Sequence, residues 1–427
     1  MSIDRKSLFT STSLSFAFWG VIATLGPLVA SGSIISGLSH NQKVFFLLIG
    51  PITVPAGNVI MGFLADKIGR RSVFTITMLL YSIGIVIISL SYALIPLAAG
   101  LILAEFGVGG EEPSSLSLIA EETKIKERPM WLTIITNFNN IGSALTAALF
   151  FVVVNDFYDR IILLVSSLTI ILSIFILRHW LNESSIWKKH AGTDYDGEKA
   201  EVYEESGVSH SWPDIKTNQN EENEGDINQA YEEGRKISPS FLSSYIFLGI
   251  IGISQYLTFG LMAYVIAPVE FPSSSQDNEI IFVALLGASV AGFFAAPLVS
   301  GRRKNYTLYS FMFGFITMLL IILLLPYLSN MVIFLPLLFA NMFMSEFAWA
   351  SRSVLEPELF STKYRSTSIG FVRLWPMIAY PVFTYLTSSM NLEDFLITNA
   401  FLWGMGFAAA LFWYGFGVET YNATMDY

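Results

Sequence analysis

Three glutamates lie close together in an otherwise apolar part of this 427-residue chain. The stretch AEFGVGGEEPSSLSLIAEE places Glu105, Glu111 and Glu112 in a run that begins apolar enough to cross a bilayer. Loss of water disfavours the charged form of a carboxylic acid, so such a group can take a proton from one side of a membrane and release it to the other. These three side chains are therefore candidates for proton coupling.

Helical geometry separates the three glutamates. Glu105 and Glu112 are seven residues apart and share one face, whereas Glu111 points about 100° away. The glycines between them thin the helix, so that a neighbouring helix or a solute can approach its backbone. An alternative interpretation is that Glu112 or Glu105 pairs permanently with a base inside the membrane, such as Arg373 or Arg352.

The elements that must hold these side chains are membrane-spanning helices. The chain is 53% hydrophobic and 14% charged, with a mean hydropathy of +0.56, which is too apolar for a soluble protein of this size. Runs of about 20 apolar residues can cross about 30 Å of hydrocarbon. Twelve such runs lie near residues 12–36, 43–65, 72–92, 95–120, 131–154, 159–181, 240–267, 278–299, 306–327, 331–355, 366–388 and 395–417.

This pattern predicts an all-α membrane protein with twelve transmembrane helices in two pseudo-symmetric six-helix bundles. We expect an N-terminal bundle over residues 1–181, an acidic cytoplasmic linker over 182–239 and a C-terminal bundle over 240–427. Residues 181–238 contain 14 acidic and 6 basic residues, and so eight of the ten net negative charges of the chain. Their charge and their few large apolar residues are typical of a linker, with a docking or regulatory segment as the alternative.

The basic residues predict the orientation of the chain. With a cytoplasmic N-terminus, the outer loops hold only Lys43 and Arg160 of the 24 lysines and arginines, and 20 of the others face the cytoplasm. Basic residues concentrate on the cytoplasmic side of membrane proteins. We therefore expect a multi-pass protein of the plasma membrane, with both termini inside.

Several kinds of site are excluded or disfavoured by composition. The chain has no cysteine, which excludes disulfides and thiolate metal sites, and its four histidines fall in loops or at the ends of spans. No nucleotide-binding loop and no nucleophile motif is present. We expect no metal, no cofactor, no nucleic-acid partner and no enzymatic activity, and we expect a monomer in the lipid bilayer.

The two halves of the chain repeat each other. Glu121 and Arg128 after the fourth span recur as Glu358 and Arg365 after the tenth, each 237 positions later. The triplet GRR follows both the second and the eighth span, 232 positions apart. Membrane proteins built from two repeated halves are usually transporters, because two similar bundles can rock about a site between them.

The most specific motif is GFLADKIGRRSVF, in the tight loop between the second and third spans. Gly62 allows two helices to approach closely, and Asp66 can accept hydrogen bonds at a helix start or from a neighbouring arginine. Gly69 permits the turn, and Arg70 and Arg71 anchor the cytoplasmic side. A simple excess of positive charge would explain the arginines but not the spacing of the glycines and the aspartate.

With this motif the chain resembles the major facilitator superfamily, and within it the branch of sugar porters and metabolite:proton symporters. The blocks GVGGEEP, AEETKIKER, NESSIWKK, ELFSTKYRSTSIGF and VETYN match that branch in place and order. The resemblance covers the whole chain except the central loop. It implies a cytoplasmic gate of ion pairs that holds the bundles together when the site faces outward, formed by Asp66, Arg70, Glu121, Arg128, Glu358 and Arg365.

The resemblance also ranks the glutamates, and the chain departs from it in three places. Metabolite symporters place an acid directly after the paired glycines, which favours Glu111. Leu101 stands where many members carry an arginine, and the first span has no acid. Ser300 lies near the position expected for a second gate aspartate, so we expect an asymmetric gate.

Polar side chains on other spans could line a solute site between the bundles. An aromatic ring to stack on and amides to bind hydroxyls suit a sugar-like or other small polar solute. Hydrogen bonding between helices is an equally good explanation for each of them. Besides Arg352 and Thr258, the candidates are Asn137, Asn140, Gln255, Tyr256, Tyr264, Asn341, Ser345, Trp349 and Arg373.

These observations predict a secondary transporter that moves a small polar organic solute by alternating access, with proton symport. One alternative is a facilitator of the same solutes without ion coupling. Another is a transporter-like sensor that binds solute and signals through the central loop. Against the sensor stands the gate motif in both halves, which a receptor locked in one state does not need.

Overall fold

A computed structural model describes most of the chain. The described residues are 3–31, 35, 38–124, 126–152, parts of 160–176, 236–237, 240–266, 274–387, 390–421 and 424–425. The predicted sixth span at 159–181 and the linker at 182–239 therefore lie largely outside the described residues.

The N-terminal helices are long and antiparallel to their neighbours in sequence. They are α1 (Ile3–Ser31), α2 (His40–Ile68), α3 (Arg70–Leu90), α4 (Leu94–Glu122) and α5 (Arg128–Val152). Gly69 joins α2 to α3 with φ of 100°, a backbone conformation that glycine adopts without strain, as the motif predicted.

The C-terminal helices repeat this arrangement. They are α10 (Phe241–Gly260), its π-helical continuation η1 (Leu261–Val265), α12 (Ser274–Val299), α13 (Arg303–Leu323), α14 (Met331–Glu358), α15 (Arg365–Thr387) and α16 (Leu392–Phe416). Short 3₁₀ turns η2 (Leu325–Tyr327) and η3 (Thr362–Tyr364) precede α14 and α15, and the two-residue strands β1 (Lys236–Ile237) and β2 (Thr424–Met425) pair in parallel.

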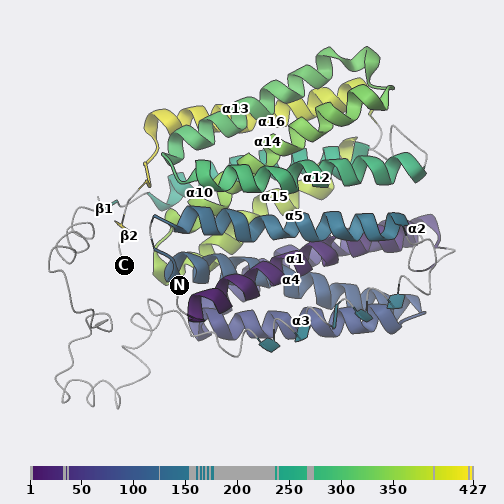
Figure 1. Cartoon of the computed structure of the whole chain (residues 1–427), viewed down its shortest axis with the longest axis horizontal. Coiled ribbons are helices and arrows are strands. Elements are labelled where there is room, and N and C mark those ends of the chain that lie inside the picture. Colours follow the sequence, from purple (N-terminus) through teal and green to yellow (C-terminus); the bar gives the residue numbers. More distant parts are fainter. Residues whose placement is uncertain are drawn as a thin grey trace.

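Ten of the described helices are long and apolar enough to cross a membrane. Helix α5, which carries three asparagines, is an eleventh long helix beside them. Figure 1 shows the N-terminal helices in purple and blue on one side, the C-terminal helices in green and yellow on the other, and both termini at the same end. The prediction of an all-α membrane protein built from two helical bundles is confirmed.

The two bundles meet along specific helix pairs. Within the N-terminal bundle α4 packs on α2 and α3, and α1 packs on α5. Within the C-terminal bundle α14 packs on α12 and α13, and α10 packs on α15 and α16. Contacts between the bundles run mainly through α2 with α15 and α5 with α12 (Figure 1).

The glycines of α4 serve helix packing. A Cβ added to Gly109 would lie 2.2 Å from the backbone oxygen of Val54 in α2, which leaves no room for a side chain. A Cβ on Gly107 would likewise lie 2.8 Å from the backbone oxygen of Thr77 in α3, so the neighbours of these glycines are helices rather than a solute. These close contacts fix the position of the α4 glutamates relative to the rest of the N-terminal bundle.

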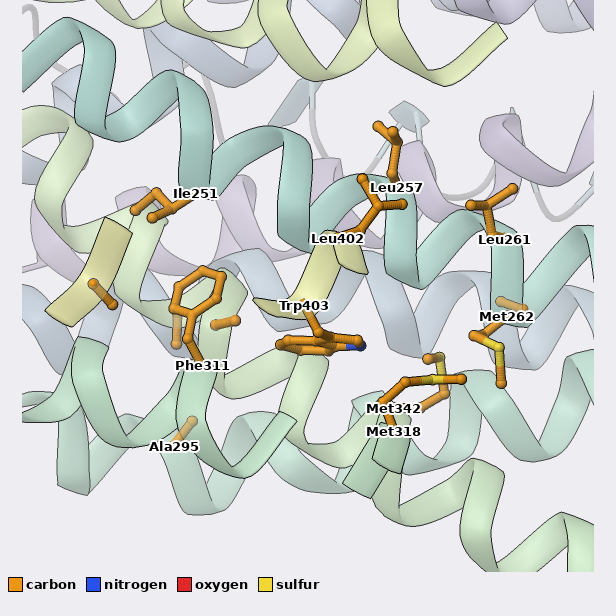
Figure 2. Packing of buried hydrophobic residues seen from close by; sticks show 14 of the residues in the cluster. Ile251, Leu257, Leu261, Met262, Ala295, Phe311, Met318, Met342, Leu402 and Trp403 are labelled. Carbon is orange, nitrogen blue, oxygen red and sulfur yellow. The ribbon is translucent and has the colours of Figure 1, made fainter. Parts of the chain in front are cut away.

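The C-terminal bundle has a well-packed apolar core around Trp403 of α16. The indole is fully buried, and its ring meets Phe311 of α13 edge to face at a centroid distance of 6.0 Å. Figure 2 shows Trp403 between Phe311 on one side and Met318 and Met342 on the other. This core makes the C-terminal bundle a rigid body against which the site can be built.

Candidate functional site

A row of buried charges links the two bundles. Arg373 of α15 forms one ion pair with Glu112 of α4, in the opposite bundle. Its Nη2 lies 2.6 Å from Oε2 of Glu356 in α14. Glu356 in turn holds Nη2 of Arg352 at 3.1 Å, and Nη1 of Arg352 donates to Gln255 of α10 at 2.8 Å.

The row is electrically balanced. It contains two carboxylates and two guanidinium groups, and each of these residues is at most 4% exposed. A buried charge is tolerable only when it is paired, and removal of one partner leaves the other uncompensated. Of these contacts, only that between Arg373 and Glu112 crosses from one bundle to the other, so it has to change if the bundles move apart at this level.

The α4 glutamates have different surroundings. Glu112 has its arginine partner, which agrees with the alternative interpretation made from the sequence. Glu105 is buried close to Gly50 of α2, where an added Cβ would lie 3.3 Å from its Oε1. It makes no hydrogen bond or ion pair with the described residues, and it lies within electrostatic range of the Tyr256 phenol. Glu111 is also buried in α4.

A second contact between the bundles joins α5 to α12 and α14. Nδ2 of Asn137 donates to the backbone oxygen of Ser289 at 2.9 Å. Nδ2 of Asn140 donates to Oε2 of Glu346 at 2.6 Å and, at 3.2 Å, to Oδ1 of Asn137. Two residues predicted for the solute site therefore hydrogen-bond across the bundle interface.

Aromatic residues also face each other between the bundles. Trp349 of α14 lies 6.2 Å from Trp19 of α1, measured between ring centroids. Two other pairs lie within the C-terminal bundle: Tyr256 of α10 meets Tyr380 of α15 edge to face at 5.6 Å, and Tyr264 of η1 meets Phe259 of α10 in the same way at 6.0 Å. The predicted Trp349 thus lies at the interface between the bundles, opposite an aromatic residue that the sequence did not single out.

The remaining predicted site residues on α14 serve their own bundle or have no partner. Nδ2 of Asn341 donates to the Thr317 hydroxyl at 3.0 Å and to the Gly314 backbone oxygen at 3.3 Å, both on α13. The hydroxyl of Ser345 is buried without a hydrogen-bond partner among the described residues. Asn341 is therefore a contact between helices within one bundle, which was the alternative explanation for this group.

Sequence reasoning missed Glu346 and Glu356, which are both buried acids of α14. The signal for Glu356 was its position four residues after Arg352, the spacing at which helical side chains meet. For Glu346, the signal was an acid in the middle of an apolar span.

The predicted cytoplasmic end carries ion pairs in both bundles. Nη2 of Arg70 lies 2.9 Å from Asp66 and 3.3 Å from Glu121. Nη1 of Arg365, from the opposite bundle, lies 2.9 Å from Oε1 of the same Glu121. Asp66 also accepts hydrogen bonds from the backbone and the hydroxyl of Thr367, at 2.8 and 2.7 Å. These contacts close this end of the bundle interface.

The same gate is built differently in the C-terminal bundle. Nη2 of Arg303 lies 3.1 Å from Glu358, which repeats the pair of Arg70 with Glu121. Arg128, the repeat of Arg365, is buried but forms no ion pair with the described residues. Among the described residues, Arg365 therefore forms an ion pair with the opposite bundle and Arg128 does not. Helices α2 and α15 also approach closely at this end, because an added Cβ on Gly62 would lie 2.7 Å from the Ser366 backbone oxygen.

Comparisons with known proteins identify the family to which this arrangement of helices belongs. A profile of the Major Facilitator Superfamily matches residues 8–384. The minor myo-inositol transporter IolF of Bacillus subtilis (strain 168) is 25% identical in an alignment of 419 positions, which covers 92% of this chain and 86% of IolF. The putative niacin/nicotinamide transporter NiaP of the same organism is 28% identical over 178 residues, so the match spans 41% of this chain and 44% of NiaP.

Among solved structures, the proton:xylose symporter XylE bound to 6-bromo-6-deoxy-D-glucose has a similar fold. It has a TM-score of 0.72 at 15% identity, and the superposition covers 98% of this chain and 97% of XylE. At this identity the likeness shows the fold alone. Together with the family profile over most of the sequence, it establishes that the chain belongs to the Major Facilitator Superfamily and is a multi-pass membrane transporter rather than an enzyme.

Proposed function

We propose that this transporter is a proton-coupled symporter of the plasma membrane, which moves a small polar organic solute by alternating access. The solute class is sugar-like or another small metabolite. The names of the similar proteins support this class, because they describe carriers of myo-inositol, of niacin or nicotinamide, and of xylose with a proton.

The observation that carries the proposal is the ion pair between Glu112 and Arg373 across the bundle interface. A proton on Glu112 would neutralise it and end the ion pair, while Arg373 would keep Glu356 as its partner. When the bundles separate at this level, the N-terminal bundle would then carry no charge on Glu112, and the two arginines of the C-terminal bundle would share Glu356. Proton binding would in this way be linked to the movement that exposes the solute site.

We assign the coupling role first to Glu112, with Glu111 and Glu105 of the same helix as the further candidates. The geometry favours Glu112 over Glu111 because the partner of Glu112 belongs to the opposite bundle. Glu105 is a candidate because it is buried without a counter-charge among the described residues. This ranking differs from the one that the family resemblance implied, which placed Glu111 first.

The solute would bind between the bundles, near the polar groups that face each other there. We propose contacts with Tyr256, Trp349 and Arg373 from the C-terminal bundle and with Asn137 and Asn140 from the N-terminal one. Gln255, Tyr264 and Ser345 complete the proposed set of contacts. Asn341, which was predicted with them, hydrogen-bonds to α13 and is proposed to support α14 rather than to contact the solute.

The ion pairs at the gate support a proposal for the state of the transporter and for its orientation. We propose that the end with Asp66, Arg70, Glu121 and Arg365 faces the cytoplasm and is closed in this state. Both termini then lie inside the cell, as the distribution of basic residues predicts.

Uptake by purified protein in proteoliposomes tests the proposal. Radiolabelled myo-inositol, xylose and nicotinate are offered with and without an inward pH gradient. We expect the gradient to drive accumulation of one of them in wild type, and Glu112→Gln to abolish the accumulation while solute exchange continues. Equal uptake with and without the gradient would instead show an uncoupled facilitator.

A further inference from the structure

We propose that Glu346 of α14 is a second proton-binding residue, and that its protonation is required for α14 to close against α5. This inference rests on the proposed proton coupling and adds to it a site in the C-terminal bundle. Four features of the structure carry it: the burial of Glu346, its lack of a counter-charge, its bond to the opposite bundle, and its depth.

Glu346 is 2% exposed, and only one of its two oxygens has a hydrogen-bond partner. Oε2 accepts from Asn140 at 2.6 Å, whereas Oε1 is buried without a partner in the described part of the chain. An ionised carboxylate offers about four acceptor sites, and leaving most of them dry and unpaired costs far more than burying the neutral acid. The surroundings therefore suit a carboxylic acid that carries a proton on Oε1.

A polar side chain of α13 also lies near Glu346, and it brings no positive charge. The phenol of Tyr306 lies within electrostatic range of Glu346. Phe347, the neighbour of Glu346 in sequence, stacks on the Tyr306 ring at a centroid distance of 5.9 Å. A phenol cannot supply the counter-charge that an ionised Glu346 would need.

The elements around α14 bring no cation to Glu346. Helices α5 and α13 carry basic residues only in their first turn, and α10 has none. In α12 the stretch from Ile280 to Val299 is uncharged. Within the membrane, α4 contributes only the acids Glu105, Glu111 and Glu112, and the bases Arg373 of α15 and Arg352 of α14 are both bound to Glu356.

The bond from Asn140 makes this site sensitive to movement. Asn140 and Asn137 are on α5, and the residues they contact, Glu346 and Ser289, are in the other bundle. Asn140 lies 12 residues after the start of α5 at Arg128, and Glu346 lies 12 residues before the end of α14 at Glu358. At about 1.5 Å per residue, both lie about 18 Å from the gate end, near the middle of the membrane.

This geometry implies a cycle. When α14 and α5 part, Glu346 meets water and can lose its proton. The charged form cannot return to the dry contact with Asn140 without a large desolvation cost, so closure waits for a proton. Glu112 differs from Glu346 because it has an arginine partner. In the closed contact Glu112 is therefore ionised while Glu346 is protonated, and the two acids bind a proton in different states of the transporter.

Spin-label distances measure this closure directly, and a chain without cysteine accepts labels at chosen positions. Cysteines replace Leu145 of α5 and Val332 of α14, which are 62% and 80% exposed. In wild type we expect the short-distance population to be present at low pH and lost as the pH rises. In Glu346→Gln it should persist at high pH, and Glu346→Asp, which still titrates, should keep the pH dependence.

The control is Glu279→Gln, which removes an exposed acid near the N-terminal end of α12 and should behave as wild type. If Glu346→Gln loses the short-distance population with rising pH as wild type does, the proposal is overturned. Infrared titration of the purified protein gives a second test that needs neither solute nor labels. A carboxylic-acid carbonyl band that titrates in wild type should be missing in Glu346→Gln and present in Glu112→Gln, and an unchanged band in Glu346→Gln contradicts the assignment.

The two proposals can fail separately. Absence of gradient-driven uptake in wild type removes the proton symport, while the infrared band and the label distances still report whether Glu346 binds a proton. Conversely, gradient-driven uptake with the wild-type pH profile in Glu346→Gln leaves the symport intact and removes the role of Glu346.

Discussion

Substitution of Arg373 by Gln should be more damaging than substitution of Glu112, its partner across the bundle interface. Arg373 holds Glu112 in one bundle and Glu356 in the other. Without the guanidinium group, Glu112 has no cation in the described part of the chain, whereas Glu356 keeps Arg352. Removal of one partner of a buried pair typically destabilises a protein by about 3–5 kcal/mol.

The reciprocal change is expected to cost less. In Glu112→Gln, Arg373 and Arg352 share Glu356, so the excess positive charge lies on guanidinium groups that both keep a carboxylate partner. In the double variant Glu112→Gln/Arg373→Gln, the uncompensated charge of the single Arg373 variant is gone. We therefore expect the double variant to be more stable than the sum of the single effects implies, by about 0.5–3 kcal/mol.

The assay is the free energy of unfolding in detergent micelles for wild type, both single variants and the double variant. Glu279→Gln serves as the control for loss of an exposed charge. Effects that add to within about 0.5 kcal/mol would refute the reasoning, because residues without a shared interaction are additive to that degree. An Arg373→Gln variant as stable as wild type would refute it as well.

Three further outcomes are expected from the packing and from the gate. Gly62→Ala places a Cβ 2.7 Å from the Ser366 backbone oxygen, so it should force α2 and α15 apart. A cysteine that replaces Thr367 should then react faster with a water-soluble thiol reagent, and an unchanged rate would argue against a tight gate. Trp403→Ala should lower the free energy of unfolding by about 3–5 kcal/mol, as measured in micelles, because the indole is fully buried. Deletion of residues 190–235 should leave solute uptake in proteoliposomes unchanged, and its loss would favour the sensor hypothesis.

The fold, and the residues that form ion pairs at one end of the bundle interface, could be predicted because their signals are local or repeated. Twelve apolar runs gave the class of protein, and the offset of 237 between Glu121 and Glu358 pointed to equivalent positions in the two bundles. The structure pairs each of these glutamates with an arginine of its own bundle, Arg70 or Arg303. Arg303 was part of the repeated GRR triplet, although its role was not inferred from it.

The contacts across the bundle interface could not be predicted in this way. Asn140 and Glu346 are 206 residues apart, and no periodicity of either helix relates them. The sequence offered both Arg373 and Arg352 as partners for a glutamate of the fourth span, and only the packing of α4 on α15 selects Arg373 for Glu112. The glycines of α4 were compatible with a helix or a solute as neighbour, and the close backbone of Val54 decides for the helix.

The measurement that tests alternating access most directly is a reversible lock on the gate. Oγ of Ser366 in α15 lies 2.8 Å from Oγ of Ser117 in α4, so cysteines at these two positions, one in each bundle, should form a disulfide on oxidation. Alternating access predicts that solute uptake stops when the disulfide forms and returns when it is reduced, while each single cysteine variant transports under both conditions. Undiminished uptake by the fully cross-linked protein would contradict it.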